Sequence, residues 1–520
     1  MSSFNLADVF EAHADAFPDR PAARCGDRSV TFGQLDRRAT QLAHYWQSQG
    51  IGPEDHIGLV LYNSIAYLEC MLAAWKIRAR TINVNYRYVA DELRYVFDNA
   101  GMVAVICEPD LAGEVAAART DTVRLVMEVG PDFEAAVASG SPERDFAPRS
   151  EEDLFILYTG GTTGMPRGVM WQHKDLFFAA LQGGNPGGEP IPDSDALTAQ
   201  MKENGDGIHI VAAPPLIHGS SQLACWIALF NGGFTALVPG RSFDAEALWQ
   251  LVDETEGHTL NIVGDAMALP LVDALEANPG RWNLSSLLVV ASAGAVLSGT
   301  AREKLEALLP GAMCLNNFGS SETGHQGAAF YEDGKPIWIM DDRHTVVLDD
   351  ENRIAATGVV GRLARFGHIP LGYYGDPEKT ARTFVTGADG RRYVIPGDMA
   401  CYAEDGTIEF LGRGAACINS GGEKVYAEEV EEALKSHPHV FDAVVVGVPD
   451  DRWGQRVEAV ITARTDAPDA GAILVHCRDH VAGYKVPKAV HVVTDLHRQP
   501  SGKPNYKWAR DHAIAQNSEG

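Results

Sequence analysis

The segment Tyr158-Thr-Gly-Gly-Thr-Thr-Gly-Met-Pro-Arg-Gly-Val169 follows the apolar run Asp153-Leu-Phe-Ile-Leu157, which predicts a strand. Glycines leave the backbone free to curl, so that several N–H groups and threonine hydroxyls turn toward one point. Arg167 adds a positive charge with forked donors. An isolated turn is the alternative for a short Gly/Thr match, but it accounts poorly for a run of this length and order. The segment therefore predicts a phosphate-binding loop that a strand holds in place.

This loop differs from the loop of P-loop nucleotidases. That motif requires the spacing G-x-x-x-x-G-K-[ST], which does not occur in this sequence. The predicted loop would therefore bind phosphate through a different arrangement of residues.

Length and composition exclude several classes of protein. With 520 residues the chain is expected to form more than one domain, and a net charge of −27 disfavours nucleic-acid binding. There is no run of about 18 apolar residues, as a membrane span requires, and the N-terminal residues do not resemble a secretory signal. The eight cysteines lack C-x-x-C or Cys/His spacing, which favours reduced thiols and a cytoplasmic location.

Alternating helix and strand patterns in the first half of the chain predict parallel α/β layers. Residues 183–207 are rich in Gly, Pro, Asp and Ser and predict an exposed loop, whereas residues 345–410 predict a β-rich subdomain. The expected fold class is α/β, with a large N-terminal domain of layered α/β sheets and a β-rich subdomain over residues 1–412. A small α+β C-terminal domain is expected over residues 413–520.

Further motifs follow the glycine-rich segment in a definite order. They are Ser292-Ala-Gly-Ala-Val296, Asn317-Phe-Gly-Ser-Ser-Glu-Thr-Gly324, Tyr393-Val-Ile-Pro-Gly-Asp398, Gly412-Arg413, Ile418-Asn-Ser-Gly-Gly-Glu-Lys-Val-Tyr426 and Gln499-Pro-Ser-Gly-Lys503. Together they resemble the adenylate-forming superfamily of acyl-CoA synthetases, peptide-synthetase adenylation domains and luciferases. The chain departs from that family at Arg167, where a lysine is usual, and at Ala415 and Ala416, where many members carry a Lys-Asp hinge.

The resemblance implies an ATP site with Mg²⁺. Phe318 would stack on adenine, Ser321 would bind phosphate and Glu322 would hold the metal. Asp398 would bind the ribose, and Arg413 would contact the ribose or a phosphate. Lys503 would bridge the substrate carboxylate and the α-phosphate, with Thr159, Arg167 and Glu322 as further catalytic residues. The complete nucleotide set implied by the resemblance is Thr159, Gly160, Gly161, Thr162, Thr163, Gly164, Arg167, Gly294, Ala295, Asn317, Phe318, Gly319, Ser320, Ser321, Asp398, Arg413 and Lys503.

The resemblance also implies an acyl pocket and a tunnel for CoA. The expected pocket residues are His218, Gln222, Cys225, Trp226, Gly264, Ala266, Ala293 and His325. Their mainly small or apolar character favours a fatty or alicyclic acid, and no acidic residue is present to pair a substrate ammonium. The expected tunnel residues are Ser420, Gly421, Gly422 and Glu423.

The implied activity is an ATP-dependent acyl-CoA synthetase of the type that acts on fatty acids or steroid side-chain acids. It would form an acyl-AMP and release pyrophosphate, and a mobile C-terminal domain would then rotate to admit CoA, with release of AMP. The alternatives are transfer to a carrier protein, a luciferase-like oxidase and a non-enzymatic acyl or nucleotide sensor. The small-molecule acid, ATP and CoA are the expected partners, and a homodimeric assembly is left open.

Overall fold

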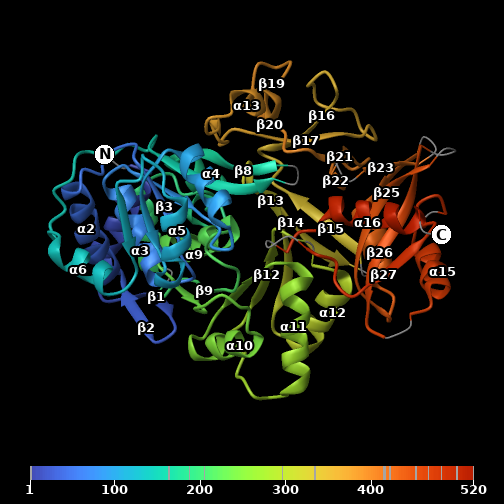
Figure 1. Ribbon diagram of the computed structural model, residues 1–520, viewed down its shortest axis with the longest axis horizontal. Helices are drawn as coiled ribbons and strands as arrows, with labels where there is room; N and C mark the ends of the chain where they lie inside the picture. The colour runs from blue at the N-terminus through green and yellow to red at the C-terminus, as the bar shows by residue number, and fades with distance from the viewer. Residues whose placement is uncertain are drawn as a thin grey trace.

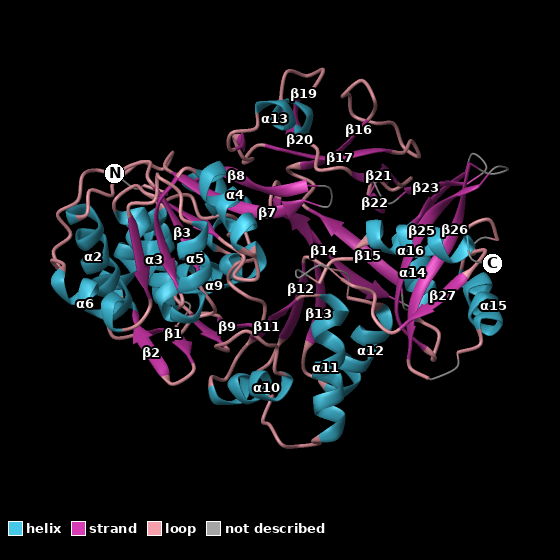
Figure 2. Cartoon of the chain, viewed as in Figure 1, coloured by secondary structure: helices cyan, strands magenta, loops and turns pink. Residues whose placement is uncertain are grey.

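A computed structural model describes residues 3–161, 164–186, 188–203, 205–295, 297–332, 335–413, 417–420, 423–450, 454–465, 468–481, 483–498 and 502–518. Figure 1 shows the chain passing from two layered α/β regions, through a β-rich region at the top of the view, to a C-terminal unit on the right. Figure 2 shows helices covering the sheets in the α/β regions, whereas strands dominate the β-rich region. The α/β fold class predicted from the sequence is confirmed.

The N-terminal α/β region contains a parallel sheet in the order β4-β3-β5-β6. Its strands are β3 (His56–Val60), β4 (Arg80–Asn83), β5 (Met102–Cys107) and β6 (Leu125–Glu128). The accompanying helices are α1 (Leu6–Ala16), α2 (Phe32–Ser48), α3 (Ile65–Lys76), α4 (Ala90–Ala100), α5 (Ala112–Ala118) and α6 (Pro131–Ser139), with the 3₁₀ helix η1 (Pro109–Leu111). Helix α3 is buried along its whole length. The ammonium of Lys76 is therefore paired with Glu11 at 2.5 Å and Asp36 at 2.6 Å, as a buried charge requires.

A second, nine-stranded sheet has the order β15-β14-β13-β12-β11-β9-β10-β1-β2. Its strands are β1 (Pro21–Cys25), β2 (Arg28–Thr31), β9 (His209–Ala212), β10 (Phe234–Leu237), β11 (Thr259–Ile262), β12 (Val289–Ala293), β13 (Met313–Ser320), β14 (Gly324–Glu332) and β15 (Lys335–Met340). Six neighbouring strands of this sheet are parallel, namely β1, β10, β9, β11, β12 and β13. Strands β2, β14 and β15, at the two edges, run antiparallel to their neighbours. The helices around this sheet are α7 (His173–Ala179), η2 (Gln182–Gly184), α8 (Ser194–Glu203), α9 (Gly219–Phe230), α10 (Ala245–Glu254), α11 (Gly264–Ala277) and α12 (Gly299–Leu308).

Alternation along β11 assigns its two faces to different neighbours. Leu260 and Ile262 are fully buried in the hydrophobic cluster that includes residues of α10, α11 and α12. Thr259 and Asn261 project to the opposite face because successive strand residues point to opposite sides. That opposite face borders a cavity, so the central strands supply both a core and a binding surface.

The β-rich region consists of two antiparallel sheets. The three-stranded sheet contains β7 (Leu154–Gly161), β8 (Gly164–Gln172) and β18 (Gly372–Tyr373). The six-stranded sheet contains β16 (Thr345–Leu348), β17 (Gly361–Phe366), β19 (Phe384–Thr386), β20 (Arg392–Val394), β21 (Asp398–Tyr402) and β22 (Ile408–Arg413), with helix α13 (Pro377–Thr383) beside it. The β-rich character predicted for residues 345–410 is confirmed by these antiparallel strands.

The C-terminal unit has its own sheet and hydrophobic clusters. Its five strands are β23 (Cys417–Ser420), β24 (Glu423–Tyr426), β25 (Val440–Asp450), β26 (Gly454–Ala463) and β27 (Val490–Val493), and its helices are α14 (Ala427–Lys435), α15 (Ala470–His480) and α16 (Tyr506–Ser518). Valines of β25 alternate between one cluster with α14 and α15 and another with α16. The exact boundary between 412 and 413 stays a prediction, and the expected hinge residues Ala415 and Ala416 lie outside the described residues.

The loop predicted over 183–207 is wrong in part, because α8 occupies Ser194–Glu203. The carboxylate of Asp193 accepts a hydrogen bond from the backbone of Ala196, and Leu197 and Met201 are each 1% exposed. Two apolar residues one turn apart bury one edge of this short helix, but they make a weak periodic signal in a polar segment. No described helix has the length and apolar character needed to cross a membrane.

Candidate active site

A cavity of about 2600 Å³ lies beside the carboxyl ends of the parallel strands in the nine-stranded sheet. Open α/β sheets bind ligands at this edge because the loops that follow the strands converge there. Of the predicted site residues, those that line the cavity are Thr159, Arg167, His218, Ala266, Ala293, Gly294, Ala295, Asn317, Phe318, Gly319, Ser320, Ser321, Glu322, His325, Asp398 and Lys503. The structure therefore brings together residues from sequence motifs that are up to about 340 positions apart.

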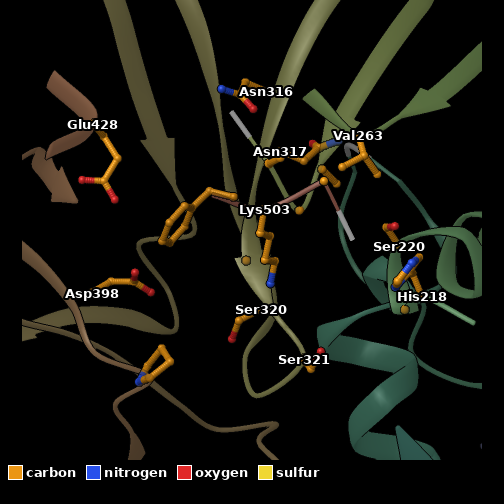
Figure 3. Close-up of a pocket in the computed structure, with 18 of the residues that line it drawn as sticks. His218, Ser220, Val263, Asn316, Asn317, Ser320, Ser321, Asp398, Glu428 and Lys503 are labelled. Carbon is orange, nitrogen blue, oxygen red and sulfur yellow. The ribbon is translucent and has the colours of Figure 1, made fainter. Parts of the chain in front are cut away.

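Lys503 enters the cavity from the C-terminal unit. Figure 3 shows its side chain extending between Asn317 and Ser320, with the ammonium group directed toward Ser320. Gly502 has φ +78°, and a side chain there would meet Val263 at 3.4 Å and Ala266 at 3.9 Å. Glycine thus lets the loop lie close to the first turn of α11 while the next residue, Lys503, reaches the cavity.

Arg498 supports the Lys503 loop, a role that the sequence motifs did not reveal. Its guanidinium forms a forked pair with Asp442, with Nε–Oδ2 and Nη2–Oδ1 distances of 2.6 and 2.7 Å. Its Nη1 donates to the carbonyl of Gly502 at 3.0 Å. The five donors of one planar group thereby connect β25 to the residue beside Lys503.

A tight turn after β13 presents Ser320, Ser321 and Glu322 to the cavity. The hydroxyl of Ser320 accepts from the backbone N–H of Glu322 at 3.2 Å, and Thr323 Oγ1 accepts from the Ser320 N–H at 2.9 Å. A Cβ on Gly319 would lie 2.0 Å from the carbonyl of Gly324, so the turn excludes larger residues there. The motif is thus a hydrogen-bonded turn that places three polar residues on the wall of the cavity.

Glu322 is held by a phenol. The hydroxyl of Tyr373 donates to Glu322 Oε1 at 2.7 Å, and Trp171 Nε1 donates to the neighbouring Ser321 carbonyl at 2.9 Å. Burial and the adjacent Glu322 carboxylate both raise the pKa of Tyr373, so it remains a neutral donor. Among the described residues no cluster of three His, Cys, Asp or Glu side chains could hold a metal. One oriented carboxylate suits Mg²⁺, which takes its remaining oxygen ligands from phosphate and water.

Asp398 lies at the left of Figure 3, and the aromatic residue Phe318 also lines the cavity. The Phe318 ring packs at 4.6 Å from Phe410 and 5.6 Å from Trp338, leaving part of its surface on the cavity. Asp398 is 4% exposed and begins β21, where it pairs in register with Arg413 of β22. The side chain of Arg413 lies outside the description, so its predicted contact with the nucleotide stays a prediction.

The glycine-rich segment is a β-hairpin, with Thr159 of β7 opposite Arg167 of β8 and Gly161 opposite Gly164. Its tip, Thr162 and Thr163, lies outside the described residues, and Gly160 is part of β7. Arg167 Nε is 2.8 Å from Asp376 Oδ2, so the predicted phosphate-binding guanidinium is oriented by a carboxylate.

Helix α9 corrects part of the predicted acyl pocket. Gln222, Cys225 and Trp226 do not line the cavity, because they lie on the face of α9 that packs into the core. Trp226 contacts Trp75 with ring centroids 4.5 Å apart, and Gln222 donates to the Leu216 carbonyl at 2.7 Å. The cavity face instead carries Leu223, Ala224 and Ile227, which recur at i, i+1 and i+4.

Gly264 also does not line the cavity, although its neighbours Val263 and Asp265 do. Of the predicted tunnel residues, Gly421 and Gly422 and the side chain of Glu423 lie outside the described residues, so the tunnel stays a prediction. Ser420 is the last residue of β23 and is opposite Glu423.

An apolar arm of the cavity follows the face of the nine-stranded sheet that α9 covers. It is lined by Ile208, Ile210, Leu223, Ala224, Ile227, Thr259, Asn261, Val289, Ala291, Leu315, Ala328 and Phe330. Strand register orders these residues: Ala293 pairs with Asn317 near Lys503, Ala291 with Leu315 one step deeper, and Thr259 with Val289 beyond them. Each two-residue step along a strand adds about 6.6 Å, so the arm has the length for an extended chain.

Two histidines of the site are neutral at neutral pH. Burial lowers the pKa of His218 to about 4, with Arg87 and Lys503 adding repulsion. Burial likewise lowers the pKa of His325 to about 4, with Arg365 as the next cause. Neither imidazole therefore supplies a positive charge to the cavity at neutral pH.

Comparisons with known proteins agree with this geometry. The profile of AMP-binding enzymes matches residues 10–374, and that of the AMP-binding enzyme C-terminal domain matches residues 429–503. The chain is 45% identical to a 3-oxocholest-4-en-26-oate–CoA ligase of Rhodococcus rhodochrous, covering 98% of this chain and 96% of the relative. It is 38% identical to the medium-chain acyl-CoA ligase Mig of Mycobacterium avium, with 99% of both chains covered.

Solved structures show the same fold at lower identity. An anthranilate CoA ligase in complex with anthranoyl-AMP matches with a TM-score of 0.84 at 21% identity, covering 100% of this chain and 99% of that one. ATP-bound MatB from Rhodopseudomonas palustris matches with a TM-score of 0.82 at 24% identity, covering 99% of each chain. From the profile match and the two curated relatives, the chain belongs to the AMP-binding enzyme family.

Proposed function

We propose that this enzyme is an ATP-dependent acyl-CoA synthetase that acts on medium-chain or long-chain fatty acids or on steroid-derived acids. The observation that carries the proposal is the junction of Lys503, the Ser320–Glu322 turn and the apolar arm in one cavity. The relatives named for fatty and 3-oxocholest-4-en-26-oic acids support the acid class. The largely apolar lining of the arm favours a hydrocarbon chain over a polar one.

In the first half-reaction the substrate carboxylate attacks the α-phosphate of ATP, forming the acyl-AMP anhydride and releasing pyrophosphate. Lys503 would offset the charge that builds as the two anions approach, and the Ser320–Glu322 turn would orient the phosphates. Glu322 would hold Mg²⁺ together with phosphate oxygens, and the ion would neutralise polyphosphate charge. Thr159 and Arg167 would contact the same phosphates from the hairpin.

In the second half-reaction the CoA thiol attacks the acyl carbonyl and AMP leaves. Lys503 would withdraw with the C-terminal domain, and Ser420–Glu423 would then line the tunnel for CoA. The enzyme would work in the cytoplasm, where ATP and CoA are available. A homodimer stays a prediction from the sequence.

The test is incubation with ATP, Mg²⁺ and CoA and a graded panel of acids from acetate to palmitate, with 3-oxocholest-4-en-26-oate included. Thioester formation from the longer acids or the steroid acid supports the proposal, and turnover confined to short polar acids contradicts it. A parallel reaction with a phosphopantetheinylated carrier protein tests the other acceptor, since the chain is 28% identical to a fatty acid–[acyl-carrier-protein] ligase of Streptomyces coeruleorubidus. Oxygen consumption would reveal a luciferase-like reaction.

A further inference from the structure

Helix α14 of the C-terminal unit contacts the N-terminal ends of two helices in the larger domain. Glu432 Oε1 accepts a hydrogen bond from the backbone N–H of Gly299, at the start of α12, at 2.7 Å. Lys435 Nζ donates to Asp265 Oδ2, in the first turn of α11, at 3.3 Å. Glu432 and Lys435 are three positions apart and so share one face of α14. One helix face thus makes two charged contacts across the interface.

The pair between Lys435 and Asp265 is largely buried. The side chains of Lys435 and Asp265 are 7% and 11% exposed. Asp265 is fixed from the other side, because its Oδ1 accepts from the Ser298 N–H at 2.8 Å. The carboxylate of Glu432 contacts the N-terminus of α12, where unpaired N–H groups and the helix dipole favour a negative charge. Asp265 and the Gly299 N–H are therefore held in place within the larger domain, independently of α14.

The same interface also influences where Lys503 lies in the cavity. Asp265 lies between Val263 and Ala266, the two residues against which Gly502 packs. Within the C-terminal unit, α14 and the Lys503 loop are both tied to β25, through Glu431 to the Val445 N–H at 2.9 Å and through Arg498 to Asp442. A shift of α14 away from α11 would consequently move Lys503 relative to the cavity.

We propose that Lys435 and Glu432 are positioning residues for acyl-AMP formation, because their contacts with Asp265 and Gly299 set the domain orientation in which Lys503 reaches the cavity. The inference rests on the proposed function, since it concerns one of its two half-reactions. Thioester formation from acyl-AMP does not use Lys503 in that position, so it does not need these contacts. Water can replace both polar contacts, which makes the interface reversible within a catalytic cycle.

The test measures the two half-reactions separately in Lys435→Met and Glu432→Gln. Acyl-AMP formation is followed by acid-dependent exchange of pyrophosphate into ATP, and thioester formation is followed from synthetic acyl-AMP and CoA. Displacement of a reacting group by about 1 Å can cost on the order of 100-fold in rate, so we expect exchange to fall about 10-fold to 100-fold. Thioester formation is expected to stay within about twofold of wild type, because it depends on the other orientation.

Two further variants complete the design. Lys435→Arg keeps the cation and is expected to recover most of the exchange activity, whereas Lys488→Met removes an exposed lysine of the same unit and should change neither reaction. Retained thioester formation shows that the variants are folded. An equal loss in both half-reactions, or no loss of exchange, overturns the inference and leaves the proposed function standing. A wild-type protein that catalyses no exchange with any acid overturns the proposed function and the inference with it.

Discussion

Arg498 Nη1 donates a hydrogen bond to the carbonyl of Gly502 at 3.0 Å, one residue before Lys503. The same guanidinium is held by Asp442 in a forked pair. The position of the proposed catalytic lysine therefore depends on Arg498 and, through it, on Asp442 of β25 in the same unit.

Replacing Arg498 by lysine should weaken acyl-AMP formation. A lysine keeps the charge but cannot bind Asp442 and the Gly502 carbonyl as a planar fork, so the Lys503 loop loses one restraint. We expect pyrophosphate exchange to fall by about 10-fold, on the basis of the sensitivity of rates to small displacements. The matched control is Arg510→Lys, at an exposed position of α16. Similar exchange rates in the two variants would contradict the positioning role.

Lys503→Ala should abolish adenylation selectively. Removing a group that stabilises developing charge costs on the order of 100-fold to 1000-fold in rate, and that charge develops in the first half-reaction. Thioester formation from preformed acyl-AMP should remain near the wild-type rate. A comparable loss in both steps would refute the role assigned to Lys503, because the lysine would then be serving the fold or both reactions.

Chain length should control specificity through the apolar arm. Each CH₂ that becomes buried contributes about 0.8 kcal/mol, so kcat/KM should rise up to about fourfold per added carbon until the arm is filled. Ile227→Trp places a large ring on the cavity face of α9 and should raise KM for long acids while short acids and ATP are unaffected. Leu288→Trp, at a position 57% exposed, is the control. An unchanged chain-length profile in Ile227→Trp would place the acyl chain elsewhere.

Glu322→Gln should raise the Mg²⁺ concentration needed for half-maximal exchange. The amide keeps the shape of the side chain and its contact with Tyr373, but it removes the charged oxygen that a hard cation prefers. Chelation of the metal should stop the wild-type reaction, and added Mg²⁺ should restore it. The half-saturating Mg²⁺ concentration in the variant is the measurement, and a value equal to that of wild type would exclude Glu322 as a ligand.

Stability should depend on pH through Glu431, which accepts from the Val445 N–H and is 5% exposed. Burial, and then the nearby Glu428, raise its pKa from 4.5 to about 8. Between these values the unfolded chain releases a proton that the folded chain keeps, so the stability contribution, complete below pH 4.5, is lost as pH rises toward 8.

Glu431→Gln removes this titration. The free energy of unfolding of the variant, minus that of wild type, should therefore increase from pH 5 to pH 8. Urea unfolding at three pH values measures the difference, and parallel curves for the two proteins would show that Glu431 ionises normally.

The sequence was sufficient to name many of the residues that line the cavity, because its motifs are local. In the Ser320–Glu322 turn, neighbouring residues satisfy one another's hydrogen bonds, and in the Thr159–Arg167 hairpin the strand pairing is between adjacent segments. Such short-range patterns can be recognised in the sequence alone, so their residues could be named before the fold was known. The α/β layering was predictable for the same reason, since hydrophobic periodicity is a local property.

Tertiary structure decided what depends on contacts between distant segments. Which face of α9 borders the cavity is set by the packing of Trp226 against Trp75, and the sequence alone gave no reason to prefer Ile227 over Trp226. The pairing of Lys435 with Asp265 joins residues 170 positions apart. Burial gives these contacts their strength, and burial exists only after the chain has folded.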